Sequence, residues 1–308
     1  MLVILAAGGK ADTGAYHVTA GGGATGIGFG HFREDAFGPL RTATVSPVPQ
    51  DGLTAVVTAR VWGAQVFLNI TGATSNTSCA LDAAGVFSLP LWQACFDRYA
   101  LPLHAAITAY GDTGSIAAIY LLDEPPHPNR WGPAGTITPA MVEAMAAYSK
   151  SLFPRIPTAV RAAPSYLRSY GKPFVHLDLT WGQYACRRGM LGPWRDQMTT
   201  GAKQLGLGLV LSLNALDGGC TSPAMATEAG YPGLFEGFGG SVENGKQFYA
   251  MGPRALSLWG RALVGHGCAL LLWQYRSGYS DHPAIRPVAD SLARLAREQP
   301  ARPCRRTG

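Results

Sequence analysis

The stretch Ile116-Ala-Ala-Ile-Tyr-Leu-Leu-Asp-Glu-Pro125 consists of an apolar run, two adjacent carboxylates and a proline. A continuous apolar run of this length predicts a strand that is buried on both faces, as in a parallel sheet, and the proline predicts where the strand ends. The chain contains only 19 Asp and Glu residues among 308, so two of them together at a strand end need a reason. Because α/β enzymes carry their chemistry at the carboxyl ends of parallel strands, this stretch is the first candidate site.

Strand and helix patterns alternate on both sides of this run. Further strands are predicted at residues 26–32, 65–71, 158–161, 174–179, 207–213 and 268–273. Helices are predicted at residues 53–63, 89–99, 101–110, 138–153, 191–205, 252–264 and 284–298. The helix after Thr138-Pro139 has the clearest start, because threonine is a good N-cap and proline fits the first helical turn.

This alternation predicts an α/β fold in which one parallel sheet runs through the whole chain. The length fits a single (β/α)8-type TIM barrel, with seven strands or with irregular ones. The eighth strand is assigned to the N-terminal apolar run, to a segment near residues 42–46, or to neither. A doubly wound open sheet is the alternative, but the Gly-rich residues 21–26 neither follow a strand nor match G-x-G-x-x-G.

No internal repeat or linker divides the chain. We expect residues 1–20 to form a flexible N-terminus or the remnant of an export signal, residues 21–300 to form the barrel domain, and residues 301–308 to form a frayed basic tail. The body of the chain has no run that approaches the ~18–20 apolar residues of a membrane span, so no membrane partner is expected.

The charge pattern excludes one class of partner. The net charge is +6, from 25 Lys and Arg residues, but these residues are scattered along the chain. A nucleic-acid-binding surface needs a basic stripe with interleaved aromatic residues, and the sequence has none. We therefore expect no nucleic-acid partner, and a monomer or a weak oligomer.

Six cysteines show no C-x-x-C and no metal-ligand spacing. An even number suits disulfides in an exported protein, and the best pairs are Cys79 with Cys95 and Cys186 with Cys220. The alternative is six independent thiols. With the low charged fraction of 14%, the cysteines favour a secreted or periplasmic location. The sequence lacks H-E-x-x-H and G-x-S-x-G, so we expect no metal, no cofactor and no serine-hydrolase chemistry.

Carboxylates, amides and aromatic residues gather where the predicted strands end. The candidates for substrate binding are Asn69, Arg161, Trp181, Gln183, Tyr184, Asn214, Asp217, Trp273, Gln274 and Tyr275. Flat aromatic faces stack on sugar rings, and amides and carboxylates bind sugar hydroxyl groups. The composition of these strand ends therefore predicts a carbohydrate substrate.

Three carboxylates are the candidates for catalysis: Glu124, Asp123 and Asp178. Successive strand residues point to opposite sides, so one of Asp123 and Glu124 should face the site; we choose Glu124 as proton donor and Asp123 as its orienting neighbour. Asp178 lies in an otherwise apolar predicted strand, where an unpaired carboxylate costs several kcal/mol, so it is the expected base or nucleophile. Its alternative is a structural pair with Arg161 or His176. Asp217 is followed by two glycines, which is typical of a turn.

The end of this strand, Tyr120-Leu-Leu-Asp-Glu-Pro125, resembles the acid-bearing fourth strand of many glycoside hydrolase barrels, in which Asn-Glu-Pro or Asp-Glu-Pro is common. With D-E-P at residues 123–125, W-x-Q-Y at residues 181–184 and L-D-G-G at residues 216–219, the chain is also similar to a group of bacterial barrel proteins without a settled activity. The first resemblance implies a glycosidase, and the second implies only the barrel.

The chain departs from the glycoside hydrolase pattern in one respect. The retaining barrel hydrolases place a nucleophilic Glu on the seventh strand, and we align residues 270–275 with that strand, where Gln274 stands instead. Three readings stay open: an inverting mechanism in which Asp178 or Asp217 activates water, a different nucleophile, or a degenerate barrel that binds carbohydrate without cleaving it. A barrel hydrolase or lyase that acts on a non-sugar polymer would use the same carboxylates.

Overall fold

The computed structural model describes residues 26–34, 37–72, 79–127, 130–239, 241–243 and 246–306. The predicted N-terminal segment, residues 1–20, lies outside these ranges. The main sheet consists of eight strands: β1 (Gly28–His31), β2 (Ala43–Pro47), β3 (Gln65–Asn69), β4 (Ile116–Asp123), β5 (Thr158–Arg161), β6 (Leu179–Tyr184), β7 (Gly208–Leu213) and β10 (Ala269–Leu272). All neighbouring strands in it are parallel.

The sheet closes into a barrel between its first two strands. Phe32 and Val45 form a parallel bridge, and the Arg33 N–H donates to the Val45 carbonyl at 3.0 Å. A side chain at Gly30 would place its Cβ 1.8 Å from the Ala43 carbonyl oxygen, so glycine permits the close approach. The predicted TIM barrel is confirmed, the eighth strand is the segment near residues 42–46, and the open-sheet alternative is wrong.

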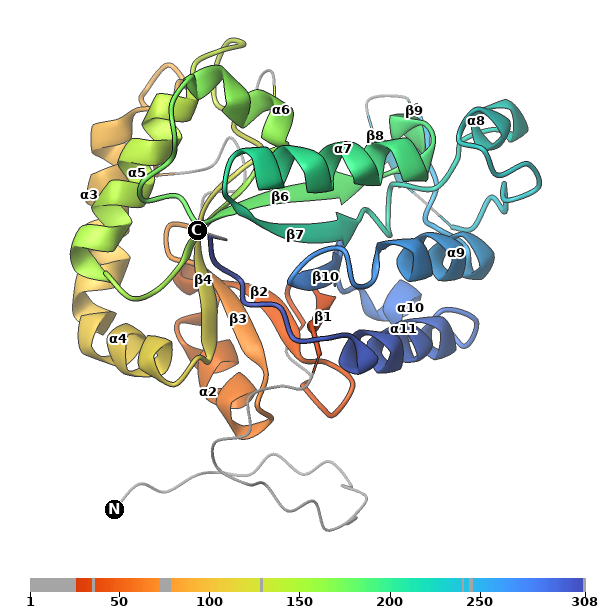
Figure 1. Ribbon diagram of the computed structural model, residues 1–308, viewed down its shortest axis with the longest axis horizontal. Helices are drawn as coiled ribbons and strands as arrows, with labels where there is room; N and C mark the ends of the chain where they lie inside the picture. Colours follow the sequence, from red (N-terminus) through yellow and green to blue (C-terminus); the bar gives the residue numbers. More distant parts are fainter. Residues whose placement is uncertain are drawn as a thin grey trace.

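Helices surround the barrel, as Figure 1 shows. They are α1 (Val48–Asp51), α2 (Thr54–Val61), α3 (Leu89–Ala100), α4 (His104–Asp112), α5 (Pro139–Leu152), α6 (Pro164–Leu167), α7 (Leu191–Gln204), α8 (Pro223–Glu228), α9 (Pro253–Leu263), α10 (Ser277–Ser280) and α11 (Arg286–Glu298), with 3-10 turns η1 (Leu101–Leu103), η2 (Arg168–Tyr170) and η3 (Cys186–Arg188). A small antiparallel hairpin joins β8 (Ser241–Glu243) and β9 (Lys246–Phe248). The predicted start of α5 is confirmed, because the Met141 N–H donates to Thr138 Oγ1 at 3.3 Å.

The barrel interior is a packed core. It includes Phe32, Phe67, Tyr120, Trp181 and Leu271, each at most 3% exposed. The rings of Phe32, Phe67 and Tyr120 all lie 5.0 to 5.4 Å from that of Trp181. Two further apolar clusters fill the space between the strands and the surrounding helices. The interior is therefore filled by side chains, as in other barrels of this type.

One predicted strand is wrong. Residues 174–178 form the connection into β6, which begins at Leu179. Phe174 and Leu177 are apolar because they are buried against the outer core, not because they belong to the sheet. The backbone N–H groups of residues 175–177 donate to the carboxylate of Glu143, at 2.8 to 3.1 Å, instead of to a neighbouring strand.

The expected frayed tail is also wrong for residues 301–306. Cys268 and Cys304 form a disulfide with a Cα–Cα distance of 5.2 Å, and Arg306 Nη1 donates to the Phe174 carbonyl at 2.9 Å. The tail therefore lies against the amino ends of the strands.

The other two disulfides, Cys79–Cys95 and Cys186–Cys220, are confirmed as predicted, so all six cysteines are paired. Disulfides of this number are typical of a chain that folds in an oxidising compartment outside the cytoplasm. Within the described ranges, no helix combines the length and the apolarity that crossing a membrane requires.

Candidate functional site

A cleft of about 780 Å³ opens at the carboxyl ends of the barrel strands. Its lining residues are Glu124, His127, Arg130, Arg161, Gln183, Arg187, Arg188, Asn214, Asp217, Phe248 and Trp273. A second hollow of about 600 Å³ adjoins it and extends toward α6 and α7. The two share Glu124, His127, Arg161, Gln183 and Arg188, so together they form one groove across this end of the barrel.

Asp123 ends β4 and lies beneath the cleft floor, with 2% exposure. Its carboxylate accepts hydrogen bonds from Tyr120 Oη at 2.6 Å, from Arg130 Nη1 at 2.5 Å and from Arg161 Nε. Burial, reinforced by the Asp123 charge, raises the pKa of Tyr120 well above its usual value. Burial alone would lower the pKa of Arg161, but the charge of Asp123 raises it. Asp123 is therefore an anchor for its neighbours, not a group that a substrate reaches.

Glu124, the next residue, turns into the cleft. Its φ of 44° is uncommon for a residue with a side chain, and the following proline restricts the backbone further. The Glu124 N–H donates to the Arg161 carbonyl at 3.1 Å, which holds this conformation. Its side chain is 23% exposed, and Oε2 lies 3.1 Å from Arg130 Nη1 and 3.4 Å from Arg161 Nη2. As strand alternation predicts, the two adjacent carboxylates face different surroundings.

The opposite side of the cleft comes from the ends of β6, β7 and β10. Gln183 Oε1 accepts from Arg161 Nη1 at 2.5 Å, and the Trp273 ring lies 5.1 Å from the Arg161 guanidinium. Asn214 Oδ1 accepts from the Asp217 N–H at 3.3 Å, which directs the turn that carries the Asp217 carboxylate into the cleft. The structure thus brings two carboxylates, two amides and one indole to a single cleft.

The sequence analysis missed five cleft residues: His127, Arg130, Arg187, Arg188 and Phe248. Arg187 and Arg188 form most of η3, directly after the end of β6. Burial, together with the neighbouring charge of Arg188, lowers the pKa of Arg187, while the charges of Glu124 and Asp217 act in the opposite direction. Two adjacent arginines just after a strand end were a signal that would have revealed this part of the cleft.

The predicted catalytic pairing of Glu124 with Asp178 is wrong. Asp178 precedes β6 and lies level with Thr158, the first residue of β5, whereas Asp123 pairs with Arg161, the last. Three residues of strand, about 10 Å, and the packed barrel interior separate the two carboxylates. Asp178 instead accepts from the Thr158 N–H at 2.9 Å and forms ion pairs with Lys150 at 2.8 Å and Arg306 at 3.5 Å.

The predicted aromatic platform is wrong in part. Trp181 fills the barrel interior, where its Nε1 donates to Ser212 Oγ at 2.9 Å. Tyr184 is fully buried in the outer core against Trp194 and Trp259. Both residues lie in β6, so their apolar surroundings follow from burial of the strand on both faces.

Three further predicted residues lie away from the cleft. Tyr275 donates its hydroxyl to Asp281 at 2.7 Å, and neither Tyr275 nor Gln274 lines the groove. Asn69, 1% exposed, lines a small cavity of about 20 Å³ beneath the cleft together with Asp123 and Trp273. Of the predicted aromatic residues, Trp273 lines the cleft and Trp181, although 1% exposed, borders the adjoining hollow.

The strand numbering also needs a correction. Residues 270–275 were aligned with a seventh strand, but β10 is the eighth strand around the barrel and β7 is the seventh. The residues that follow the seventh strand are Asn214 and, three positions later, Asp217. Gln274 therefore does not occupy the position to which it was assigned. Within the ranges that the structure describes, no group of three or more His, Cys, Asp or Glu side chains is arranged to hold a metal ion.

Comparison with known proteins gives no family. No protein-family model matches the chain, and no curated protein matches it either. Among solved structures, a thermostable mutant of a xylanase from Cellvibrio japonicus is similar at 10% identity, with 87% of this chain and 97% of that chain covered and a TM-score of 0.48.

Two longer proteins are similar over part of their length. β-Glucuronidase 3 from Bacteroides uniformis matches at 13% identity, 76% coverage of this chain and a TM-score of 0.46, but the chain spans only 28% of that protein. A chitinase from a Paenibacillus species matches at 12% identity, 87% coverage and a TM-score of 0.45, over 33% of its length. At such identities and TM-scores, these likenesses assign no activity.

Proposed function

We propose that the protein is an exported glycoside hydrolase, secreted or periplasmic, with Glu124 as proton donor and Asp217 as the second carboxylate. The observation that carries the proposal is that both carboxylates line one open cleft at the carboxyl end of the barrel. Asp217 takes the role that the sequence left open between it and Asp178, because Asp178 lies at the other end of the barrel.

In this mechanism Glu124 gives its proton to the glycosidic oxygen as the bond to the anomeric carbon breaks. Asp217 takes a proton from the water molecule that attacks the same carbon. One product therefore carries a hydroxyl group at the former glycosidic oxygen and the other carries a new anomeric hydroxyl group. Glu124 ends ionised and Asp217 ends protonated. Gln183 and Asn214 bind sugar hydroxyl groups, and Trp273 offers an apolar face for a sugar ring. Asp123 holds Arg130 and Arg161, which in turn position Glu124.

The test is hydrolysis of a panel of polysaccharides and aryl glycosides by the native chain and by Glu124→Gln and Asp217→Asn. Each substitution should lower kcat by roughly 10²- to 10⁴-fold, the usual contribution of a general acid or base, without changing the thermal midpoint by more than a few degrees. Asp196→Asn is the matched control, because its side chain is 65% exposed on α7. Unchanged turnover in both cleft variants would exclude the proposal.

A second candidate is a barrel that binds carbohydrate without cleaving it. One observation favours it: Glu124 Oε2 is within ion-pair distance of both Arg130 and Arg161, an arrangement typical of a carboxylate that holds its neighbours in place. The same panel separates the two functions. Glycan binding by the native chain, with no release of reducing ends from any substrate, would support the binding protein over the hydrolase.

A further inference from the structure

Arg187 and Arg188 are exposed cations of the cleft for which the described part of the chain shows no hydrogen-bonded or ion-paired partner. Both side chains line the cleft, and no side chain in the described ranges forms a hydrogen bond or an ion pair with either guanidinium. The situation of Arg130 and Arg161 is different, because each contacts both Asp123 and Glu124. The two sides of the cleft therefore differ: one has balanced charges and the other has two adjacent unpaired guanidinium groups.

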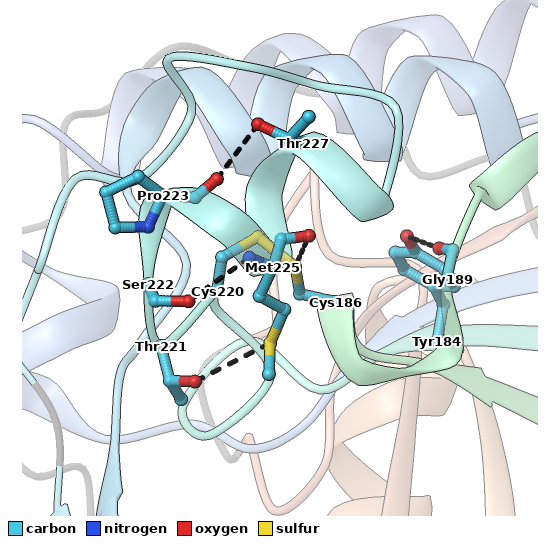
Figure 2. The surroundings of a disulfide bond; sticks show 9 residues. All are labelled: Tyr184, Cys186, Gly189, Cys220, Thr221, Ser222, Pro223, Met225 and Thr227. Carbon is cyan, nitrogen blue, oxygen red and sulfur yellow. Dashed lines mark hydrogen bonds between the residues drawn. A yellow bond between two sulfur atoms is a disulfide. The ribbon is translucent and has the colours of Figure 1, made fainter.

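The turn that carries these arginines is fixed at several points, as Figure 2 shows for its surroundings. The Cys186–Cys220 disulfide joins it to the loop after β7, and the Cys186 N–H donates to the Gly218 carbonyl at 2.8 Å. Tyr184 Oη donates to the Gly189 carbonyl at 2.7 Å on the other side of the turn. The backbone that carries Arg187 and Arg188 is thus fixed on both sides of the turn.

The disulfide also joins the arginine turn to the carboxylate that we propose for catalysis. Asp217 and Gly218 belong to the loop that Cys220 anchors, and a Cβ at Gly218 would lie 2.2 Å from the Asn214 carbonyl oxygen. This close packing leaves the loop little freedom to move relative to η3. An anionic group held by Arg187 and Arg188 would therefore have a defined position relative to Asp217.

We propose, resting on the proposed function, that the cleft takes an anionic glycan whose carboxylate or sulfate group binds between Arg187 and Arg188. A guanidinium group presents parallel N–H donors that match the two oxygens of a carboxylate or sulfate. Two like charges on adjacent residues repel each other, and an anion bound between them removes that repulsion. The sugar ring that bears the anion then lies near both Glu124 and Asp217, whose charges both act on Arg187, and Trp273 lines the same cleft.

Nucleic acid is a poorer fit to the same cations. A nucleic-acid strand carries a phosphate on every nucleotide, and Glu124 and Asp217 would repel those that lie along the cleft. A glycan carries neutral hydroxyl groups between its anionic groups, and these hydroxyls suit the carboxylates and the amides of Gln183 and Asn214. Single-stranded DNA is therefore a competing probe in the test.

The test measures binding by calorimetry with the Glu124→Gln chain, so that hydrolysis does not interfere. The probes are an oligogalacturonate, its carboxyl-reduced neutral form, a sulfated dextran oligosaccharide and single-stranded DNA. We expect one of the two anionic sugars to bind at least tenfold more tightly than the neutral form, which distinguishes a uronate from a sulfate ester. This preference should weaken as salt rises from about 50 to 500 mM.

The arginine substitutions make the proposal specific to the site. Adding Arg187→Gln with Arg188→Gln should reduce the anionic affinity roughly tenfold or more and leave the neutral affinity unchanged. Replacing both arginines with lysine should reduce the anionic affinity by an intermediate amount, because lysine keeps the positive charge but lacks the parallel N–H donors of a guanidinium group. Arg294→Gln, on the outer helix α11, is the matched control and should have no effect.

Three results would overturn the proposal: equal affinity for the neutral form, no effect of the arginine substitutions in a chain with native thermal stability, or DNA binding as tight as that of the anionic sugars. Hydrolysis by the native chain is measured separately. Anionic binding without turnover would contradict the proposed hydrolase alone, and turnover of neutral glycans only would contradict the anionic preference alone.

Discussion

The two ends of the barrel each hold a carboxylate that lies between cations. At the carboxyl end, Asp123 is bound by Arg130 and Arg161 and lies under a cleft of about 780 Å³. At the amino end, Asp178 is bound by Lys150 and Arg306. In sequence the two acids look alike, since each stands in or beside an apolar run.

The tail crosses one end of the barrel, where Arg306 borders a hollow of about 630 Å³, and leaves the other end uncovered. The tail crosses the amino end, where a Cβ at Gly208 would lie 2.5 Å from the Arg305 carbonyl oxygen, and Cys268–Cys304 holds it there. At the carboxyl end, Cys186–Cys220 holds a rim loop beside open space. A buried ion pair is therefore not evidence of a functional site by itself; what distinguishes the carboxyl end is that its cleft holds Glu124 and Asp217 together.

The largest effect should follow from Asp123→Asn at the carboxyl end. Arg161 is 4% exposed and would lose its buried counter-charge, so we expect the free energy of unfolding to fall by about 3–5 kcal/mol. The measurement is urea unfolding of the variant and the native chain. Glycan binding should also weaken, because Arg130 and Arg161 would no longer be held against Glu124. Retained stability would mean that Glu124 alone is a sufficient counter-charge for Arg161.

The two disulfides at opposite ends form a matched pair for the second prediction. Cys186–Cys220 and Cys268–Cys304 close segments of similar length, with sequence separations of 34 and 36. Replacing both cysteines of either pair by Ser should cost about 3–4 kcal/mol, because chain entropy depends on the length of the closed loop. Thermal or urea unfolding under non-reducing conditions measures this cost.

The functional consequences of the two losses should differ. Removing Cys186–Cys220 frees the turn of Arg187 and Arg188, so anionic glycan affinity should fall, measured at a temperature where the chain is folded. Removing Cys268–Cys304 should leave that affinity unchanged, because the tail lies at the amino end. Equal losses of affinity would contradict the separation of the two ends.

The barrel was accessible from sequence because burial on both faces and helical periodicity are local signals. β4 and α5 follow them closely, and strand alternation correctly predicted that only one of Asp123 and Glu124 faces the cleft. The same signals wrongly predicted a strand at residues 174–178. The backbone N–H groups of residues 175–177 donate to the carboxylate of Glu143, which lies more than thirty residues earlier in the chain. An apolar run shows that residues are buried but not what satisfies their backbone.

The parts of the site that depend on three-dimensional packing were not accessible. Asp178 could be assigned to a barrel end only once the start of β6 was known, and the Cys268–Cys304 pair depends on how the tail folds back. Trp181 was predicted to be an exposed stacking surface, because sequence does not distinguish such a ring from one that fills the barrel and only borders the groove. The sequence shows that Arg187 and Arg188 are adjacent, but only the structure shows that they line the same cleft as Asp217.

Asp178→Asn at the amino end should have a smaller effect than Asp123→Asn. Arg306, one of its two ion-pair partners, is 41% exposed and can be rehydrated, so the expected loss is about 1–3 kcal/mol of unfolding free energy. Hydrolysis or binding of the glycan that the native chain recognises should be unchanged per folded molecule. A Glu124-like loss of turnover in this variant would return Asp178 to the catalytic candidates.

The smallest effect concerns His266, in the connection that leads into β10 at the amino end. Partial burial, with the charges of Arg195 and of Arg302 in the tail, lowers the pKa of His266. The unfolded chain therefore binds more protons than the folded one between the ordinary His pKa of about 6.5 and the lowered folded value, and stability falls as the pH drops through that window.

His266→Gln should remove this part of the pH dependence, measured as the difference between the thermal midpoints of the two chains from pH 8 to pH 5. The ring is exposed, so the difference should be small, and it should shrink when Cys304→Ser with Cys268→Ser releases Arg302. Because the effect arises at the amino end, glycan affinity should have the same pH profile in both chains; a profile that changes with His266→Gln would show that the two ends are coupled.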